Sequence, residues 1–398
     1  MRRTRSMLAA TLVAVVTVAV ACAPMAPPFP AEKDGGLDPD TAPQANVAAY
    51  STRGPNDVGV ITVEIEPGRQ AEVWYPAPAG AATGGTPEKY DVREFLAPSL
   101  NALLAPGVTA EFVTDSVRGL PVAPGGPYPL ALFSHGASSY RLQSTVLTTH
   151  LASWGFVVIS PDYFERGLQA LGGTPPAPTR SDTDVADLAF NAAVALNTSG
   201  ALAGAIDTTR LFPFGHSAGG GTSTRLSTRT NVSSWIAMSS GVNLTPTLTN
   251  PNPTVPVALA DPTKNVMWIT GQQDNIATYG SVINAYNYSA GEKKLVAIPL
   301  VGHNNAMTDI CEIARDQGGL VGLALAAGLP LPDFILNLAR DGCISPPFAT
   351  GFDSWPVVRH FITAEMRYRA GLDAQPVGLG VGVTANFGAL APTYTHAE

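Results

Sequence analysis

Residues 215–219 read Gly-His-Ser-Ala-Gly, the pattern of a sharp turn that joins a strand to a helix. The pattern follows residues 210–214, Arg-Leu-Phe-Pro-Phe, which we expect to be a strand, and it precedes a helix expected to begin near Gly220. In so tight a turn only glycine fits beside the central residue, and the serine side chain is pushed into the open. Ser217 is therefore the candidate nucleophile.

The segments around this turn alternate between strand-like and helix-like patterns. Such alternation is typical of a parallel sheet covered by crossover helices. The strand-like runs lie at 130–133, 156–159, 210–214, 235–238, 266–270 and 295–299, and the helix-like patterns lie at 145–154, 184–196 and 353–366. Two antiparallel strands are expected between about 58 and 75. The sequence therefore predicts an α/β fold with a mostly parallel central sheet flanked by helices.

A serine hydroxyl needs a general base, and histidine is suited because its unperturbed pKa is about 6.5. His303 follows the last expected core strand, whereas the other five histidines lie in motif loops, helices or the tail. The acid belongs between the nucleophile and the histidine, at the end of a strand. Asp274 follows the strand 266–270, while Asp261 precedes a proline and fits a surface turn. We expect Ser217, His303 and Asp274 to form the catalytic set.

An oxyanion formed during attack on a carbonyl needs two backbone N–H donors. One is expected from Ala218, directly after the nucleophile. The second is expected from Ala137, in the loop after the strand 130–133, where Gly136 lets the backbone turn. Together with Ser217, Asp274 and His303, two such backbone donors would support acyl chemistry at a serine.

Three segments together resemble one branch of the α/β-hydrolases. They are Phe-Ser-His-Gly-Ala at 133–137, Leu-Ala-Ser-Trp-Gly-Phe-Val-Val at 151–158, and Gly-His-Ser-Ala-Gly-Gly-Gly at 215–221. The branch holds platelet-activating-factor acetylhydrolases, dienelactone-hydrolase-like enzymes and bacterial cutinase-like polyester hydrolases. The resemblance spans roughly residues 52–310 and implies the α/β-hydrolase fold with a Ser-His-Asp triad, but it does not specify the substrate.

Departures from the pattern distinguish members of this branch. The acetylhydrolases place their acid after the strand that follows the nucleophile helix, where this chain has Ser239 and Ser240. Asp274 matches the cutinase-like placement instead. Cutinase-like enzymes, however, usually carry aromatic side chains where this chain has Ala137 and Val242. The resemblance therefore does not favour a polyester substrate.

The first residues have the form of an export signal, residues 1–21, with three arginines followed by an apolar run at 7–20 that is too short to span a membrane. Residues 19–22 resemble a bacterial lipobox, which would make Cys22 a lipidated N-terminus, although the usual leucine is absent. Ordinary cleavage after a small-x-small triplet is the alternative. Either outcome predicts an extracytoplasmic protein, secreted or lipid-anchored at the cell surface.

The rest of the chain divides by composition. Residues 22–50 are rich in Pro, Ala and Gly and are expected to be a tether, 51–370 the catalytic domain and 371–398 a C-terminal tail. Because exported thiols tend to pair, we expect a disulfide between Cys311 and Cys343, with two free thiols as the alternative. The apolar segment 311–350 is expected either to form a cap insertion over the site or to pack on the body of the domain.

Composition limits the partners. Hydrophobic residues make up 45% of the chain and charged residues 14%, which gives enough apolar material for a core. The formal net charge is −8 and no basic cluster follows the first residues, so we expect no nucleic-acid partner. No cluster of His, Cys, Asp or Glu has the spacing of metal ligands, so neither a metal nor an organic cofactor is implied. The expected partner is a small ester or lipid substrate, with membrane contact only through an N-terminal lipid anchor.

The sequence thus predicts a secreted serine esterase or lipase that hydrolyses carboxylic esters through an acyl-enzyme. Two alternatives stay open at this point. One is an acyltransferase on the same fold, and the other is a surface-binding lipoprotein that has kept the fold and lost the activity. A peptidase is disfavoured because no added propeller or peptide-gating domain is present in the pattern. The acyl length, the alcohol group and the oligomeric state do not follow from the sequence.

Overall fold

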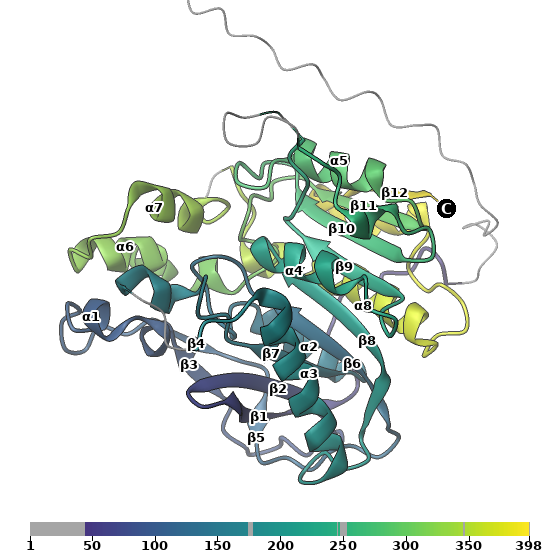
Figure 1. Cartoon of the computed structure of the whole chain (residues 1–398), viewed down its shortest axis with the longest axis horizontal. Helices are drawn as coiled ribbons and strands as arrows, with labels where there is room; N and C mark the ends of the chain where they lie inside the picture. Colours follow the sequence, from purple (N-terminus) through teal and green to yellow (C-terminus); the bar gives the residue numbers. More distant parts are fainter. Residues whose placement is uncertain (1–43, 174–177, 245, 247–252, 345–346, 398) are drawn as a thin grey trace, which may run out of the picture. The chain divides into compact units, whose positions relative to one another are not determined.

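A ten-stranded sheet runs through the residues that the computed structural model describes, 44–173, 178–244, 246, 253–344 and 347–397 (Figure 1). Its order is β12-β11-β10-β9-β8-β6-β7-β2-β1-β5. The strands are β1 Asp57–Glu66, β2 Arg69–Ala77, β5 Val117–Arg118, β6 Tyr128–Ser134, β7 Val157–Pro161, β8 Ile206–His216, β9 Ser234–Met238, β10 Asn265–Gly271, β11 Lys293–Ile298 and β12 Thr393–Ala397. The six strands from β6 to β11 pair in parallel. The predicted α/β-hydrolase sheet is confirmed, including its antiparallel β1–β2 pair.

Helices cover both faces of this sheet. Within the described residues they are α1 Pro98–Asn101, α2 Thr145–Ser153, α3 Asp182–Thr198, α4 Ala218–Leu226, α5 Tyr279–Tyr288, α6 Gly319–Ala326, α7 Asp333–Arg340 and α8 Gly351–Ala370. Short 3₁₀ turns are η1 Val92–Phe95, η2 Leu168–Gly172, η3 Val257–Ala260, η4 Ile310–Glu312, η5 Arg315–Gln317 and η6 Val381–Leu390. A second sheet pairs β3 Lys89–Asp91 with β4 Glu111–Val113.

Successive side chains of a strand point to opposite faces of the sheet, so one apolar run contributes side chains to the hydrophobic cores on both faces. In β6, Ala131 and Phe133 face a core shared with α2 and α8, whereas Leu130 and Leu132 face a core shared with α3 and α4. Every residue of β6 is buried. Burial on both faces is the reason that this strand reads as a continuous apolar run in the sequence.

The domain extends beyond both limits that the sequence analysis assigns to it. Residues 371–397 are not a free tail, because β12 pairs antiparallel with β11 and Tyr394 is buried in the core. At the other end, Tyr50 is buried and its N–H donates to His360 of α8. These contacts join segments far apart in the chain, so local sequence patterns do not predict them. The predicted signal peptide, Cys22 and most of the predicted tether lie outside the described residues.

The N-terminus of α2 is held by a distant carboxylate. Its own cap residue, Ser144, makes no side-chain capping bond. Asp309 instead accepts the N–H groups of Thr145 at 2.9 Å and Val146 at 3.1 Å, the hydroxyl of Thr145, and the hydroxyl of Tyr90 at 3.0 Å. Burial raises the pKa of Asp309 to about 7, and the accepted hydrogen bonds limit that rise. The carboxylate therefore satisfies helix donors that water cannot reach.

We predict that Asp309→Ala lowers the free energy of unfolding by about 3 kcal/mol at pH 8, because several buried donors lose their acceptor. Urea unfolding followed by circular dichroism measures the change. The matched control is Asp316→Ala, an exposed carboxylate in η5, which should change the stability by less than about 0.5 kcal/mol. Equal stability of the two variants would contradict this assignment.

Candidate active site

Ser217 lies at the turn between β8 and α4 with a backbone φ of 56°. A positive φ is uncommon for a residue other than glycine and needs support from its surroundings. The N–H of Ser217 donates to Met238 O of β9 at 2.8 Å. A Cβ at Gly215 would overlap the backbone of Gly219, and a Cβ at Gly219 would overlap Ser134 O of β6. Both glycines are therefore required by close packing, as the motif predicts.

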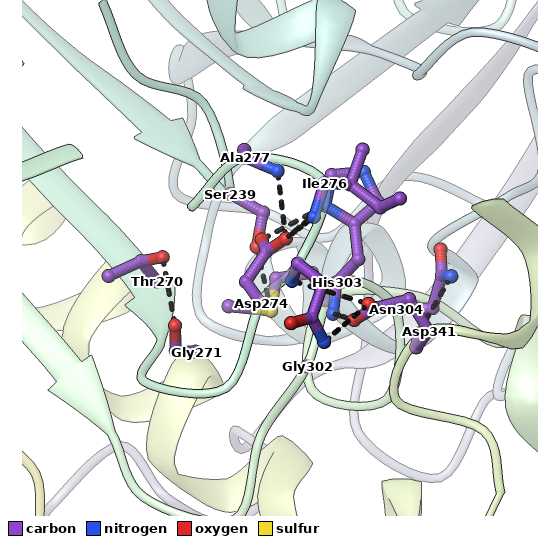
Figure 2. Close-up of polar contacts among 12 residues, drawn as sticks. Ser239, Thr270, Gly271, Asp274, Ile276, Ala277, Gly302, His303, Asn304 and Asp341 are labelled. Atoms are coloured by element: carbon purple, nitrogen blue, oxygen red, sulfur yellow. Dashed lines mark hydrogen bonds and ion pairs between the residues drawn. The ribbon is translucent and has the colours of Figure 1, made fainter. Parts of the chain in front are cut away.

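Asp274 and His303 form a buried pair at the ends of β10 and β11. His303 Nδ1 lies 2.9 Å from Asp274 Oδ2 and 3.1 Å from Oδ1 (Figure 2). Asp274 Oδ1 also accepts the N–H groups of Ile276 and Ala277, each at 2.8 Å. A carboxylate accepts only, so Nδ1 of the imidazole carries the proton and Nε2 is left as the base.

His303 Nε2 is buried and makes no hydrogen bond within the part of the chain that the structure describes. His303 and Ser217 line the same pocket. The described contacts therefore contain no bond between the serine hydroxyl and Nε2. Catalytic hydrogen bonds often tighten only when substrate is bound.

The candidate oxyanion donors are the backbone N–H groups of Ala137, in the loop after β6, and Ala218, directly after Ser217. In the loop after β6, the N–H of Gly136 donates to Gln143 Oε1 at 2.8 Å and that of Ser138 donates to Arg166 O at 2.6 Å. Ala137 lies between them, and among the described contacts its N–H has no acceptor. The same holds for Ala218, the first residue of α4, where helix N–H groups are unpaired by geometry. The two predicted oxyanion donors are thus available.

His216 and Gln143 connect the loop after β6 with the loop that carries His303. Gln143 Nε2 donates to His216 Nδ1 at 2.6 Å, and His216 Nε2 donates to His303 O at 2.8 Å. Burial and the neighbouring His303 place the pKa of His216 well below 6.5, so this ring stays neutral with one donor and one acceptor. Sequence reasoning missed Gln143, because a single glutamine outside any motif carries no signal.

His135 shapes the loop after β6 and does not titrate near neutral pH. Its Nε2 accepts the N–H of Tyr163 at 3.0 Å, and its Nδ1 lies 2.8 Å from Gly136 O. Burial, together with the charge of Arg166, lowers the pKa of His135 to about 3. The ring therefore acts as a neutral brace for the backbone at Gly136.

The pocket that Ser217 and His303 line is mainly aliphatic. Its empty volume is about 1040 Å³, counted out to the open mouth. One wall comes from the segment 92–110 and the facing wall from 310–339, and Tyr140 is the one aromatic ring, apart from the histidines, among the described residues that line it. The aliphatic side chains are Val92, Leu96, Leu104, Val108, Leu168, Leu171, Ile310, Leu320, Val321, Leu323, Leu329, Leu331, Ile335, Leu336 and Leu338.

A disulfide joins Cys311 to Cys343, as the sequence analysis expects, which removes the alternative of two free thiols. The bond closes the segment that carries α6 and α7. Side chains of both helices line the pocket that Ser217 also lines. We call residues 311–343 the cap.

No curated protein matches the sequence. A family model described as "Platelet-activating factor acetylhydrolase, isoform II" matches residues 65–168, from within β1 to the first residue of η2, and ends before Ser217. Among solved structures, a ferulic acid esterase from Streptomyces cinnamoneus is similar, with 21% identity and a TM-score of 0.54. The similarity covers 88% of this chain and 99% of that one.

Together with the sheet order, the similarity to this solved structure confirms the predicted α/β-hydrolase fold. The carboxylate bonded to His303 is that of the candidate acid. Asp274 follows β10, whereas Ser239 after β9 is buried and its hydroxyl lies 3.9 Å from Met307 Sδ. The carboxylate that reaches the histidine is the one on the later strand.

We predict that Gln143→Met slows the reaction of Ser217 with a fluorophosphonate probe about 10- to 100-fold, because small misplacements of a reacting group cost this much. The variant leaves Gly136 N–H and His216 Nδ1 without partners. Intact-protein mass spectrometry measures the rate of labelling. Gln70→Met, at an exposed position of β2, is the matched control and should label at the normal rate. An unchanged rate in a folded Gln143→Met protein would refute the prediction.

Proposed function

We propose that this chain hydrolyses carboxylic esters through an acyl-enzyme on Ser217. One observation carries the proposal. His303 Nδ1 is bonded to Asp274, its Nε2 has no hydrogen-bond partner among the described residues, and His303 lines the same pocket as Ser217. A base oriented by a third group beside a serine on a strained turn is the arrangement that nucleophilic catalysis requires.

In the proposed reaction, the oxygen of Ser217 attacks the ester carbonyl carbon while His303 Nε2 takes the hydroxyl proton. The N–H groups of Ala137 and Ala218 stabilise the negative oxygen of the tetrahedral intermediate. The carbon–oxygen bond of the ester then breaks, and the protonated His303 gives its proton to the leaving alcohol. Water attacks the acyl-enzyme by the same route and releases the acid. Asp274 keeps the imidazole in one tautomer and stabilises its cation.

The similar proteins support ester hydrolysis by their descriptions, since one is an esterase and the other an acetylhydrolase. They differ in the acid that the ester contains, so the substrate has to be argued from the pocket. We propose an aliphatic acyl chain. Arg93 carries the charged group among the described residues of the lining. Its guanidinium donates hydrogen bonds to Asn101 Oδ1 and to Val108 O. Because the rest of the lining is mainly aliphatic, a chain of methylene groups gains by burial, at about 0.8 kcal/mol for each.

We propose that the protein works outside the cytoplasm. The form of residues 1–21 supports export, and the Cys311–Cys343 disulfide is stable in an oxidising compartment. Among the described residues, no helix has both the length and the apolar character needed to cross a membrane. Lipidation at Cys22 is the further step that mass spectrometry of the exported protein would test.

We predict that the mature protein hydrolyses p-nitrophenyl esters and that Ser217→Ala reduces the rate to background, because the nucleophile is gone. The chain-length optimum should lie above acetyl, since the pocket lining is mainly aliphatic. Release of p-nitrophenol from acetyl to palmitoyl esters measures both. Adding a competing alcohol distinguishes hydrolysis from acyl transfer by the products. Equal activity in Ser217→Ala would contradict the proposal, and no activity in the wild type would favour a binding protein.

A second variant tests the acyl pocket. Ala324 of α6 is buried and lines the pocket, so Ala324→Phe should fill part of it. We predict that kcat/KM for decanoyl esters falls at least about 10-fold, the loss of roughly two buried methylene groups, while acetyl esters are little affected. Ala326→Phe, exposed on the same helix, is the matched control. An equal fall for all chain lengths would place the acyl chain elsewhere.

A further inference from the structure

Asp341, at the end of α7, contacts both loops that carry the His303–Asp274 pair. Its Oδ1 accepts the backbone N–H of His303 at 2.7 Å (Figure 2). Its Oδ2 accepts the backbone N–H of Asn275 at 3.2 Å and the side-chain amide of Asn275 at 3.0 Å. One carboxylate therefore bridges the residue after Asp274 and His303 itself.

The backbone of the same residue strengthens the bridge. Asp341 O accepts the backbone N–H of Asn304 at 3.1 Å and its side-chain amide at 3.0 Å. The same amide donates to Leu338 O of α7 at 2.7 Å. The loop 302–305 is thus bonded to the end of α7 at four points, counting the bond from His303. A helix of the cap and the loop of the histidine form one hydrogen-bonded unit.

The packing at this contact leaves no room for adjustment. A Cβ at Gly302 would overlap Asp341 Oδ1, and a Cβ at Gly342 would overlap Asn305 Oδ1. Gly342 also has a φ of 88°, which favours glycine. The disulfide at Cys343 then fixes the chain two residues beyond Asp341. Asp341 therefore lies between helix α7 before it and the disulfide-bonded Cys343 after it.

A carboxylate suits this position because it must accept three N–H donors and offer none. Asp341 makes no ion pair among the described residues, and its side-chain hydrogen bonds there are those from His303 and Asn275. An asparagine at this position would keep one oxygen as acceptor for the N–H of His303. Its NH₂ group would then face the N–H groups of Asn275, so that donors would face donors. The residue type is therefore explained by the two loops that it joins, and not by a salt bridge on the surface.

We propose that Asp341 is a positioning residue that sets the distance and angle between Asp274 and His303. The proposal rests on the proposed function, in which that pair activates Ser217. Asp341 acts through the two loops and touches neither the substrate nor the reacting atoms. It also links the cap to the catalytic pair. Side chains of α7 line the pocket, and Asp341, the residue directly after α7, accepts the backbone N–H of His303.

We predict that Asp341→Ala lowers kcat for p-nitrophenyl esters at least about 10-fold and leaves KM within about twofold, because the histidine is displaced while the acyl pocket remains. Asp341→Asn should retain more activity, since one oxygen still accepts the N–H of His303. Asp333→Ala, an exposed carboxylate in the first turn of the same helix, is the matched control and should behave as the wild type.

A second readout does not depend on any substrate. The proton on His303 Nδ1 gives a downfield proton NMR signal when it is held by Asp274, and its loss in His303→Ala assigns it. We predict that this signal is present in the wild type and Asp333→Ala and is shifted or lost in Asp341→Ala. If Asp341→Ala does not fold, Asn275→Ala removes one of the three donors and should give a smaller fall in kcat and a smaller shift.

The outcomes separate this proposal from the proposed function. A raised KM with unchanged kcat, or a lowered melting temperature with kcat and the NMR signal unchanged, overturns the positioning role. A wild-type protein that hydrolyses no ester overturns the proposed function, and the NMR signal then decides the role of Asp341 alone. A fall in kcat together with a shifted signal supports both.

Discussion

The backbone of Ser217 holds a positive φ, and much of the site follows from how that conformation is kept. Three parallel strands contribute to it. β8 delivers the residue, Gly219 packs against Ser134 at the end of β6, and the N–H of Ser217 bonds to Met238 at the end of β9. Because strain of this kind costs of order 1–3 kcal/mol, it persists only where neighbours determine it. Three strands in the middle of the sheet therefore hold the backbone of Ser217 in this conformation.

The other groups of the site lie in loops that follow parallel strands. In a parallel sheet the carboxyl ends of the strands lie at one edge. The loop after β6 brings Ala137, the loop after β10 brings Asp274, and the loop after β11 brings His303. None of these loops is held by the sheet alone. Gln143 ties the first loop to His216, and Asp341 ties the other two to the cap. Orientation at the site thus depends on polar bonds between loops.

Much of this arrangement could be predicted from the sequence, and the successes share a cause. The strands, the turn at Ser217 and the positions of Asp274 and His303 depend on local patterns and on chain order, which a sequence displays. The contacts that brace them could not be found in this way. Gln143, Asp341 and the long-range cap at Asp309 act through tertiary contacts between distant segments, and each is a single polar residue without a motif.

The same limit explains the ends of the domain. The strand β12 reads as part of a tail because its five residues carry no strong apolar pattern, and its partner β11 lies almost a hundred residues earlier. Tyr50 likewise reads as the end of a tether until α8 packs against it. Edge strands and terminal segments are stabilised by tertiary contacts with distant residues, so their own sequence can lack a clear apolar pattern.

Direct observation of the acyl-enzyme tests the central claim most closely. The wild-type protein would be mixed with p-nitrophenyl hexanoate, quenched in acid within the first turnovers, digested and mapped by mass spectrometry. We predict a hexanoyl adduct on the peptide that contains Ser217 and on no other peptide. Hydrolysis without any adduct, or an adduct on a different residue of the folded protein, would contradict the account.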